Sequence, residues 1–206
     1  MKYLFKTLLL FCILLHASIQ GVSQNVTLVT GNLLFLKGQG NIRIAYDYSS
    51  MKVGNMTEED YIKKKFNDYK DSPGRGEKWY TAWRSDRKQF FQPAFEENMN
   101  KHIAPLFITS FDTSTAYVLV VKTTYLEPGF RAYRYVKEAA RINLTYTFIN
   151  TRTREVVAVL SSYEVRCTYN SYDVASRVKS AYGNAGRILG KYIANIQKND
   201  YVIQKY

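Results

Sequence analysis

The chain has 206 residues, of which 29 are Lys or Arg and 17 are Asp or Glu, so its net charge is +12. A field of this sign favours anionic partners. The two cysteines, Cys12 and Cys167, fall on opposite sides of a predicted cleavage site, which excludes an intramolecular disulfide in the mature chain and makes stability depend on core burial.

The first 23 residues have the pattern of a secretory signal peptide. Lys2 and Lys6 form a positive start, and an apolar run over 8–15 follows that is too short to span a bilayer. Gly21 and Ser23 supply the small residues that a signal peptidase requires. We therefore expect cleavage after Ser23, no lipid attachment and no transmembrane span in the mature protein.

Residues 24–206 are expected to form a single globular domain that is periplasmic or secreted and associated with the cell envelope. Leader removal takes two lysines and no acid, which lowers the net charge from +12 to +10. Outside the cytoplasm, an envelope protein or an anionic glycan or lipid surface is a more available partner than nucleic acid. A basic surface that only keeps the protein soluble is the alternative. The sequence assigns no oligomeric state.

The first half of this domain combines a predicted hairpin with helices. Residues 33–49 predict two strands around a turn at Gly38–Asn41. Thr57 is expected to cap a helix that runs to about Lys70, with acidic residues in its first turn. Aromatic and apolar residues over 77–103 recur at three- and four-residue steps, which predicts two helical pieces that meet at Pro93.

The second half predicts a sheet and a long closing helix. Residues 117–121 are continuously apolar, which is typical of a central strand covered on both faces, and a Pro-Gly turn at 127–130 ends it. Residues 142–149 and 156–165 alternate around 150–153 and predict a hairpin. A helical stripe over 171–199 is expected to lie across the sheet. The fold class is α/β (α+β), a layered and mostly antiparallel sheet packed with helices.

Three segments resemble a family of bacterial exported proteins, the domain-of-unknown-function 4410 group. They are Tyr-Leu-Glu-Pro-Gly-Phe-Arg-Ala-Tyr-Arg at 125–134, the hairpin turn at 150–155, and Ala-Gly-Arg-Ile-Leu-Gly-Lys-Tyr-Ile at 185–193. The family is similar in fold to envelope domains related to curli secretion and penicillin-binding-protein activation. The resemblance implies a layered α/β envelope domain with no known catalytic residues.

Most catalytic classes lack their residues in this sequence. After the leader, His102 is the only histidine and Cys167 the only cysteine, and neither lies near a nucleophile signature. No metal-ligand spacing and no cofactor fingerprint is present, so we expect no metal, no cofactor and no catalytic residue. A polymer hydrolase that uses paired carboxylates remains the enzymatic alternative, with Glu127 and Glu138 the best placed acids.

Residues 130–137 interleave aromatic and basic side chains, a chemistry that stacks on rings while it neutralises acidic groups. If the segment is extended, Arg131, Tyr133, Tyr135 and Lys137 share one side. With Arg134, these residues form a candidate binding strip. The alternative is an edge strand that its charges protect from aggregation.

Gly183, Gly186 and Gly190 form a stripe beside the apolar face of the closing helix. Glycine inside a helix costs about 1 kcal/mol relative to alanine, so the stripe calls for an offsetting gain. We expect a groove that accepts another backbone, either the N-terminal helix of this chain or a partner.

The sequence therefore predicts an exported, non-enzymatic protein that binds a macromolecular partner through a basic, aromatic surface. The alternatives are the hydrolase with two carboxylates and an exported binder of anionic polymers or nucleic acid.

Overall fold

The computed structural model describes residues 26–112, 114–133, 137–169 and 171–203, and the side chains up to residue 198. The predicted leader, Arg134 and Tyr135 lie outside these residues. The helical segments are η1 Leu34–Leu36, α2 Glu58–Asp68, α3 Arg75–Asp86, the π-helical turn η2 Arg87–Phe91, α4 Gln92–Ile103 and α5 Val174–Ile203. The strands are β1 Val26–Gly31, β2 Asn41–Asp47, β3 Lys52–Val53, β4 Met56–Thr57, β5 Phe107–Thr109, β6 Tyr117–Glu127, β7 Phe130–Arg131, β8 Lys137–Glu138, β9 Arg141–Asn150 and β10 Val156–Arg166.

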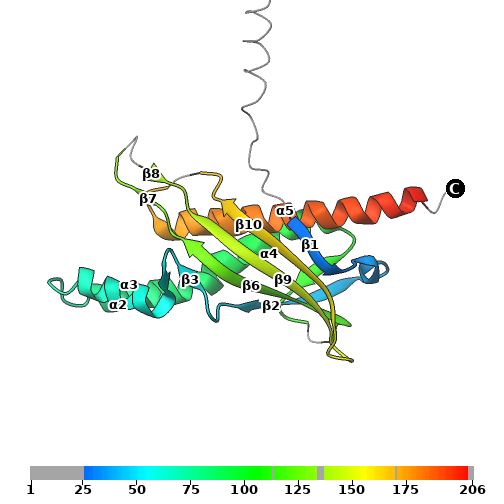
Figure 1. The fold of residues 1–206 in the computed structure, drawn as a ribbon, viewed down its shortest axis with the longest axis horizontal. Helices are drawn as coiled ribbons and strands as arrows, with labels where there is room; N and C mark the ends of the chain where they lie inside the picture. Colours follow the sequence, from blue (N-terminus) through cyan, green and yellow to red (C-terminus); the bar gives the residue numbers. More distant parts are fainter. Residues whose placement is uncertain (1–25, 113, 134–136, 170, 204–206) are drawn as a thin grey trace, which may run out of the picture.

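One mixed sheet and a pair of helices form the two main layers. The strand order is β1-β10-β9-β6-β2-β5, with β3 paired to β6 and β4 paired to β3. The pairs from β1 to β6 are antiparallel, whereas β2 joins β6 and β5 in parallel. Helices α4 and α5 cover one face of this sheet, and α2 and α3 extend beyond its end (Figure 1). The predicted α/β class, with a mostly antiparallel sheet and a long C-terminal helix, is confirmed.

The core lies between the sheet and these two helices. The inward residues of β9 alternate with half-buried ones, and Tyr146 and Phe148 are fully buried. The ring of Phe95 from α4 lies 6.1 Å from that of Tyr146, and Phe91 stacks on Tyr182 of α5 at 5.3 Å. The hydroxyl of Tyr182 shares a 2.6 Å hydrogen bond with Thr123, which satisfies a polar group that burial would otherwise penalise.

The prediction of a hairpin over residues 33–49 is wrong. Residues 34–36 form one turn of 3₁₀ helix, and β2 pairs with β5 and β6 instead of with an earlier strand. Leu33 and Leu36 are buried while Leu34 is 52% exposed, so the apolar contacts recur every third residue, as in a 3₁₀ turn, and not every second residue.

The other predicted elements form close to their expected bounds. Thr57 caps α2, because its hydroxyl accepts a hydrogen bond from the backbone N–H of Asp60. Pro93 occupies the first turn of α4, directly after the π-helical turn, so the two helical pieces meet there. β6 has a neighbour on each side, as a central strand does, but Val120 on its second face is only half-buried.

Candidate functional site: an aromatic and basic tip

The aromatic and basic segment after the Pro-Gly turn forms a small hairpin, not one extended strip. β7 pairs with β8 so that Arg131 lies opposite Lys137. Gly129 adopts a left-handed conformation with φ of 62°, and a side chain there would collide with the backbone at Glu138 and Ala139. Because β7 and β8 are antiparallel, the chain reverses between them, so the proposed alternation of Arg131, Tyr133, Tyr135 and Lys137 along one straight face does not occur. Arg134 and Tyr135 lie outside the described residues.

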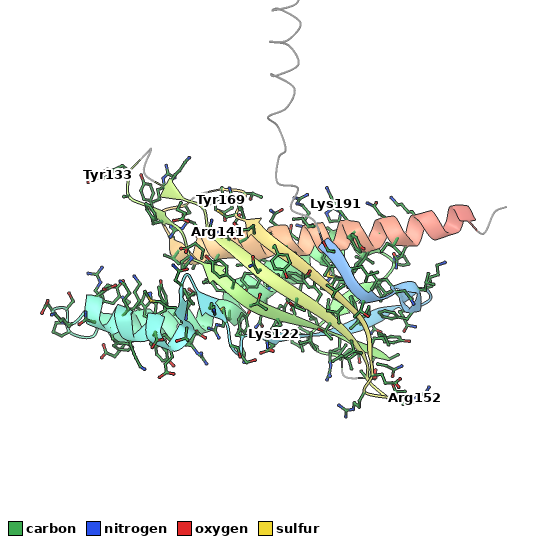
Figure 2. The ribbon with its side chains drawn as sticks, viewed as in Figure 1. Lys122, Tyr133, Arg141, Arg152, Tyr169 and Lys191 are labelled. Atoms are coloured by element: carbon green, nitrogen blue, oxygen red, sulfur yellow. The ribbon has the colours of Figure 1, made fainter. Side chains whose placement is uncertain are left out.

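Exposed aromatic side chains gather around this hairpin. Tyr133 is 73% exposed and stands at the tip, with Tyr169 nearer the sheet (Figure 2). The guanidinium of Arg131 lies 4.4 Å from the ring centroid of Tyr172, which is itself 63% exposed. This stack holds a cation on an aromatic face at the protein surface. We call Phe130, Arg131, Tyr133, Lys137 and Tyr172 the tip.

Arg177 fastens the tip to the rest of the fold. Its side chain is 2% exposed and donates to four carbonyl oxygens, those of Pro128 at 3.1 Å, Gly129 at 2.8 Å, Ser171 at 2.8 Å and Tyr172 at 2.9 Å. Burial lowers the pKa of this guanidinium. One side chain therefore joins the turn before β7 to the segment that carries Tyr172.

Asp173 completes the frame at the beginning of α5. Its carboxylate accepts a hydrogen bond of 2.8 Å from the backbone N–H of Ser176. Burial alone would raise the pKa of Asp173, but the hydrogen bonds from Ser176 and Ala175 bring it below its usual range. The carboxylate thus caps the helix and stays charged beside Arg177.

The two acids of the hydrolase alternative make structural contacts at this end. Glu127 accepts a 3.1 Å hydrogen bond from the backbone N–H of Gly129, which stabilises the turn. Glu138 lies 3.4 Å from the guanidinium of Arg141, which also contacts Glu164 at 3.5 Å. Among the described residues, no group of three or more His, Cys, Asp or Glu side chains is placed to hold a metal.

The glycine stripe of α5 is covered by α4 of the same chain. A methyl group on Gly186 would overlap the carbonyl of Phe95, and one on Gly190 would lie 2.8 Å from the carbonyl oxygen of Met99. The occupant is therefore the helix at 92–103 and not the more N-terminal helix at 58–68. Helix α4 fills the space beside Gly186 and Gly190, so a partner cannot dock there. Of the three glycines, Gly183 alone borders a hollow.

Two residues that fix the tip carry no signal in the sequence. Arg177 falls inside a regular helical pattern and bonds to the turn at Pro128, more than 40 residues earlier. Tyr172 precedes that helix and contacts Arg131, 41 residues earlier. Only the pairing of distant segments brings them to β7.

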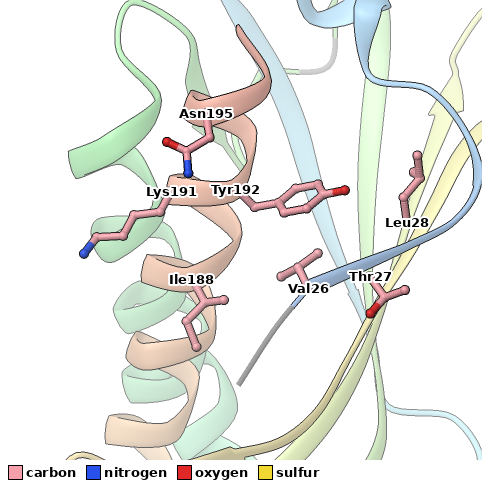
Figure 3. Close-up of a pocket in the computed structure, with 7 residues that line it drawn as sticks. All are labelled: Val26, Thr27, Leu28, Ile188, Lys191, Tyr192 and Asn195. Carbon is pink, nitrogen blue, oxygen red and sulfur yellow. The ribbon is translucent and has the colours of Figure 1, made fainter. Parts of the chain in front are cut away.

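A second hollow, of about 600 Å³, lies between the edge strand β1 and α5 (Figure 3). Val26 and Leu28 line it from the strand, and Ile188 and Tyr192 from the helix, with Lys191 at its side. Thr27 and Asn195 also line it, so its walls mix apolar and polar groups. None of the described helices combines the length and the apolar run that crossing a bilayer requires.

No family model and no curated protein matches the chain, but some solved structures have a similar shape. Solved structures of similar shape include the PelC dodecamer from Paraburkholderia phytofirmans, with 13% identity, a TM-score of 0.38, and coverage of 81% of this chain and 97% of that one. A domain-of-unknown-function 330 protein from Xanthomonas campestris has 13% identity, a TM-score of 0.38, and coverage of 84% and 94%.

The resemblance to the 4410 group is therefore wrong. No family model matches, and the solved structures include a member of the 330 group instead. The short segments behind the resemblance are explained locally, because the Pro-Gly turn and the glycines of α5 serve this chain's own packing. TM-scores below 0.5 assign neither an activity nor an assembly to this protein.

Proposed function

We propose that the chain is an exported, non-enzymatic protein that binds an anionic macromolecule with its tip. The observation that carries this proposal is the stack of the half-buried Arg131 on the exposed ring of Tyr172, held by the buried side chain of Arg177. A surface that is both rigid and exposed loses little conformational entropy when it binds. The net charge of the whole chain adds a long-range attraction of the same sign.

An acidic glycan, an anionic lipid surface or an acidic envelope protein fits this surface. Aromatic faces contact sugar rings or acyl groups, and the adjacent cations neutralise the acids that such partners carry. Nucleic acid carries suitable charge but is the least available of these partners for an exported protein.

The test uses dextran sulfate as the probe and dextran as its uncharged counterpart. The double variant Arg131→Gln, Lys137→Gln is compared with Lys63→Gln, Lys64→Gln, which removes the same charge. Lys63 contacts Glu59 at 2.9 Å and Lys64 contacts Asp68 at 2.9 Å on the surface of α2, and neither lysine belongs to the tip. At about 50 mM salt we expect roughly a tenfold loss of affinity for the tip variant and less than about a twofold loss for the control.

Equal losses in the two variants would show that binding follows diffuse charge and would overturn the tip as the site. Binding of dextran as tight as that of dextran sulfate would overturn the anionic class. Export has its own measurement: the intact mass of the protein recovered from its native host should correspond to a chain that begins at Gln24 without an acyl group. A mass that retains residues 1–23 would contradict export by a cleaved leader.

A further inference from the structure

The hollow that Gly183 borders has a volume of about 310 Å³ and lies on the seam between α4 and α5, beside the segment that follows β10. The α5 side contributes Lys179, Ser180, Gly183, Asn184 and Arg187. The opposite walls are Ala94 and Asn98 of α4 together with Thr168 and Tyr169. Two cations and several neutral polar groups therefore line this hollow, and no carboxylate is among its lining residues.

The two cations contact neutral groups: the Nζ atom of Lys179 lies 5.9 Å from the ring centroid of Phe90, and Arg187 bonds to Asn184. Among the described residues, no carboxylate lies within ion-pair distance of Lys179 or Arg187. Arg187 is oriented by Asn184, whose Oδ1 accepts hydrogen bonds from Nε at 3.2 Å and from Nη2 at 2.6 Å. Glu97 is the acid in electrostatic reach of Lys179, and it is bonded to Lys101 at 2.7 Å.

The positive potential of the seam also acts on a neighbouring histidine. Burial and then the charges of Lys191, Arg187 and Lys101 lower the pKa of His102. A cation-repelling position of this kind attracts an anion for the same electrostatic reason.

The neutral lining groups are those that recognise hydroxyls. Ser180 shares hydrogen bonds of 2.9 Å with the backbone N–H and the hydroxyl of Thr168, and Asn98 donates to the carbonyl of Ala94 at 2.8 Å. These contacts fix the hydroxyl and amide groups before any ligand arrives, which lowers the entropic cost of binding. Tyr169 is 53% exposed and offers an aromatic face at the rim.

Gly183 leaves room for the hollow. A methyl group at this position would lie 3.1 Å from the side-chain amide of Asn98 and 3.6 Å from the carbonyl oxygen of Ala94. Unlike Gly186 and Gly190, whose space is filled by the backbone of α4, this glycine faces lining groups of the hollow.

We propose that this hollow binds one anionic sugar unit. Arg187 and Lys179 hold the acidic group, the amides and hydroxyls of the lining contact the ring hydroxyls, and Tyr169 packs on the ring. The volume suits a single ring, since it falls at the lower end of the range for small-molecule pockets, about 300–1,000 Å³. The site uses none of the residues of the tip and goes beyond the function proposed for it.

The test measures the binding of four probes by calorimetry at low salt: glucuronate, glucose 6-phosphate, glucose and inorganic phosphate. We expect at least one of the two anionic sugars to bind about tenfold tighter than both glucose and phosphate. The two anionic probes distinguish a carboxylate from a phosphate as the acidic group. Arg187→Gln and Lys179→Gln should each weaken that binding about tenfold, whereas Lys198→Gln, an exposed lysine farther along α5, should leave it unchanged.

Inorganic phosphate that binds as tightly as glucose 6-phosphate, with glucuronate no tighter than glucose, would overturn the sugar proposal. Equal affinities in Lys179→Gln and Lys198→Gln would overturn the site, and so would the absence of binding by every probe. Thermal melting of each variant separates lost binding from lost folding, and Lys179 is exposed, so its substitution should leave the melting temperature in place. The Arg131→Gln, Lys137→Gln variant should bind the anionic sugar normally, so failure here is distinct from failure of the tip.

Discussion

Two pairs of helices, α4 with α5 and α2 with α3, are stabilised by different interactions. Helices α4 and α5 approach through glycine, so that backbone meets backbone at Gly186, and they bury apolar side chains against the sheet. Helices α2 and α3 extend past the sheet (Figure 1), and α2 has no buried residue at all. The stability of the first pair therefore rests on close packing, and that of the second on a few specific contacts.

Those contacts centre on Glu58 and a cluster of rings. The carboxylate of Glu58 accepts a hydrogen bond of 2.8 Å from the indole of Trp83 and another from Arg87, whose guanidinium lies 4.4 Å from the ring centroid of Tyr48. Tyr61 of α2 packs 5.3 Å from the ring of Trp83. Glu58 and these rings thus anchor the outer pair to the body of the protein, whereas α5 is held along much of its length.

The largest expected effect is a substitution that forces α4 and α5 apart. Gly186→Leu should lower the free energy of unfolding by about 3 kcal/mol. The new side chain would meet backbone atoms of Phe95, and a backbone cannot move aside by changing a rotamer. Gly186→Ala should also destabilise the protein, although alanine gains about 1 kcal/mol of helix propensity over glycine. Urea unfolding followed by circular dichroism measures both changes.

Gly40 and Gly183 provide the controls for this prediction. Nothing lies within 4 Å of a methyl group placed on Gly40, so Gly40→Leu should change stability by less than about 0.5 kcal/mol. In α5 itself, the methyl group of Gly183→Ala would lie 3.1 Å from the end of the Asn98 side chain, not against a backbone, so its destabilisation should be smaller than that of Gly186→Ala. Equal effects at the two helical positions would contradict the backbone contact as the cause.

How far the sequence predicted these regions depends on the range of the interactions. The hairpin of β9 and β10 was predicted because both arms alternate around a short turn, and Thr57 because a cap acts within three residues. The stripe of glycines showed that a backbone must approach α5, but not that α4 would supply it, since several helices were available. Contacts between segments far apart in the chain leave no local pattern.

Glu58 has one role that the sequence predicts and one that it does not. Its place in the first turn of α2 indicates a charge that suits the helix dipole, and the structure agrees. Its bonds to Trp83 and Arg87, 25 and 29 residues away, depend on how α2 folds back against α3. The tip follows the same rule, because Arg131 was proposed from its sequence neighbours whereas its ring partner Tyr172 was not.

The next effect in size tests the anchor of the outer pair. Glu58→Gln should lower stability by about 2 kcal/mol, because Arg87 is 8% exposed and would lose its charged partner. Glu59→Gln removes an acid with a side chain 78% exposed that pairs with Lys63, and should cost less than about 0.5 kcal/mol. Hydrogen exchange should locate the loss in α2 and α3 while α5 stays protected. Exchange that becomes as fast in α5 as in α2 and α3 would show that the two helix pairs are not independent.

The smallest expected effect concerns the charge on the seam of α4 and α5. Burial and the nearby cations Lys191, Arg187 and Lys101 lower the pKa of His102, so the unfolded chain binds a proton at this residue more readily than the folded protein does. The stability associated with neutral His102 is therefore present above the usual histidine pKa of about 6.5, and it is lost as the pH falls through the lower pKa of the folded state. Because the side chain is only half-buried and the charges are screened, the loss between about pH 7 and about pH 5 should stay below about 1 kcal/mol. The difference in unfolding free energy between the protein and His102→Gln isolates this contribution, since the carboxylates titrate alike in both.

Titration of the His102 ring by NMR measures the pKa directly. Lys191→Gln should raise this pKa toward the usual value, whereas Lys63→Gln, on the outer pair, should not move it. A His102 pKa at or above the usual value would show that the seam carries no net positive potential.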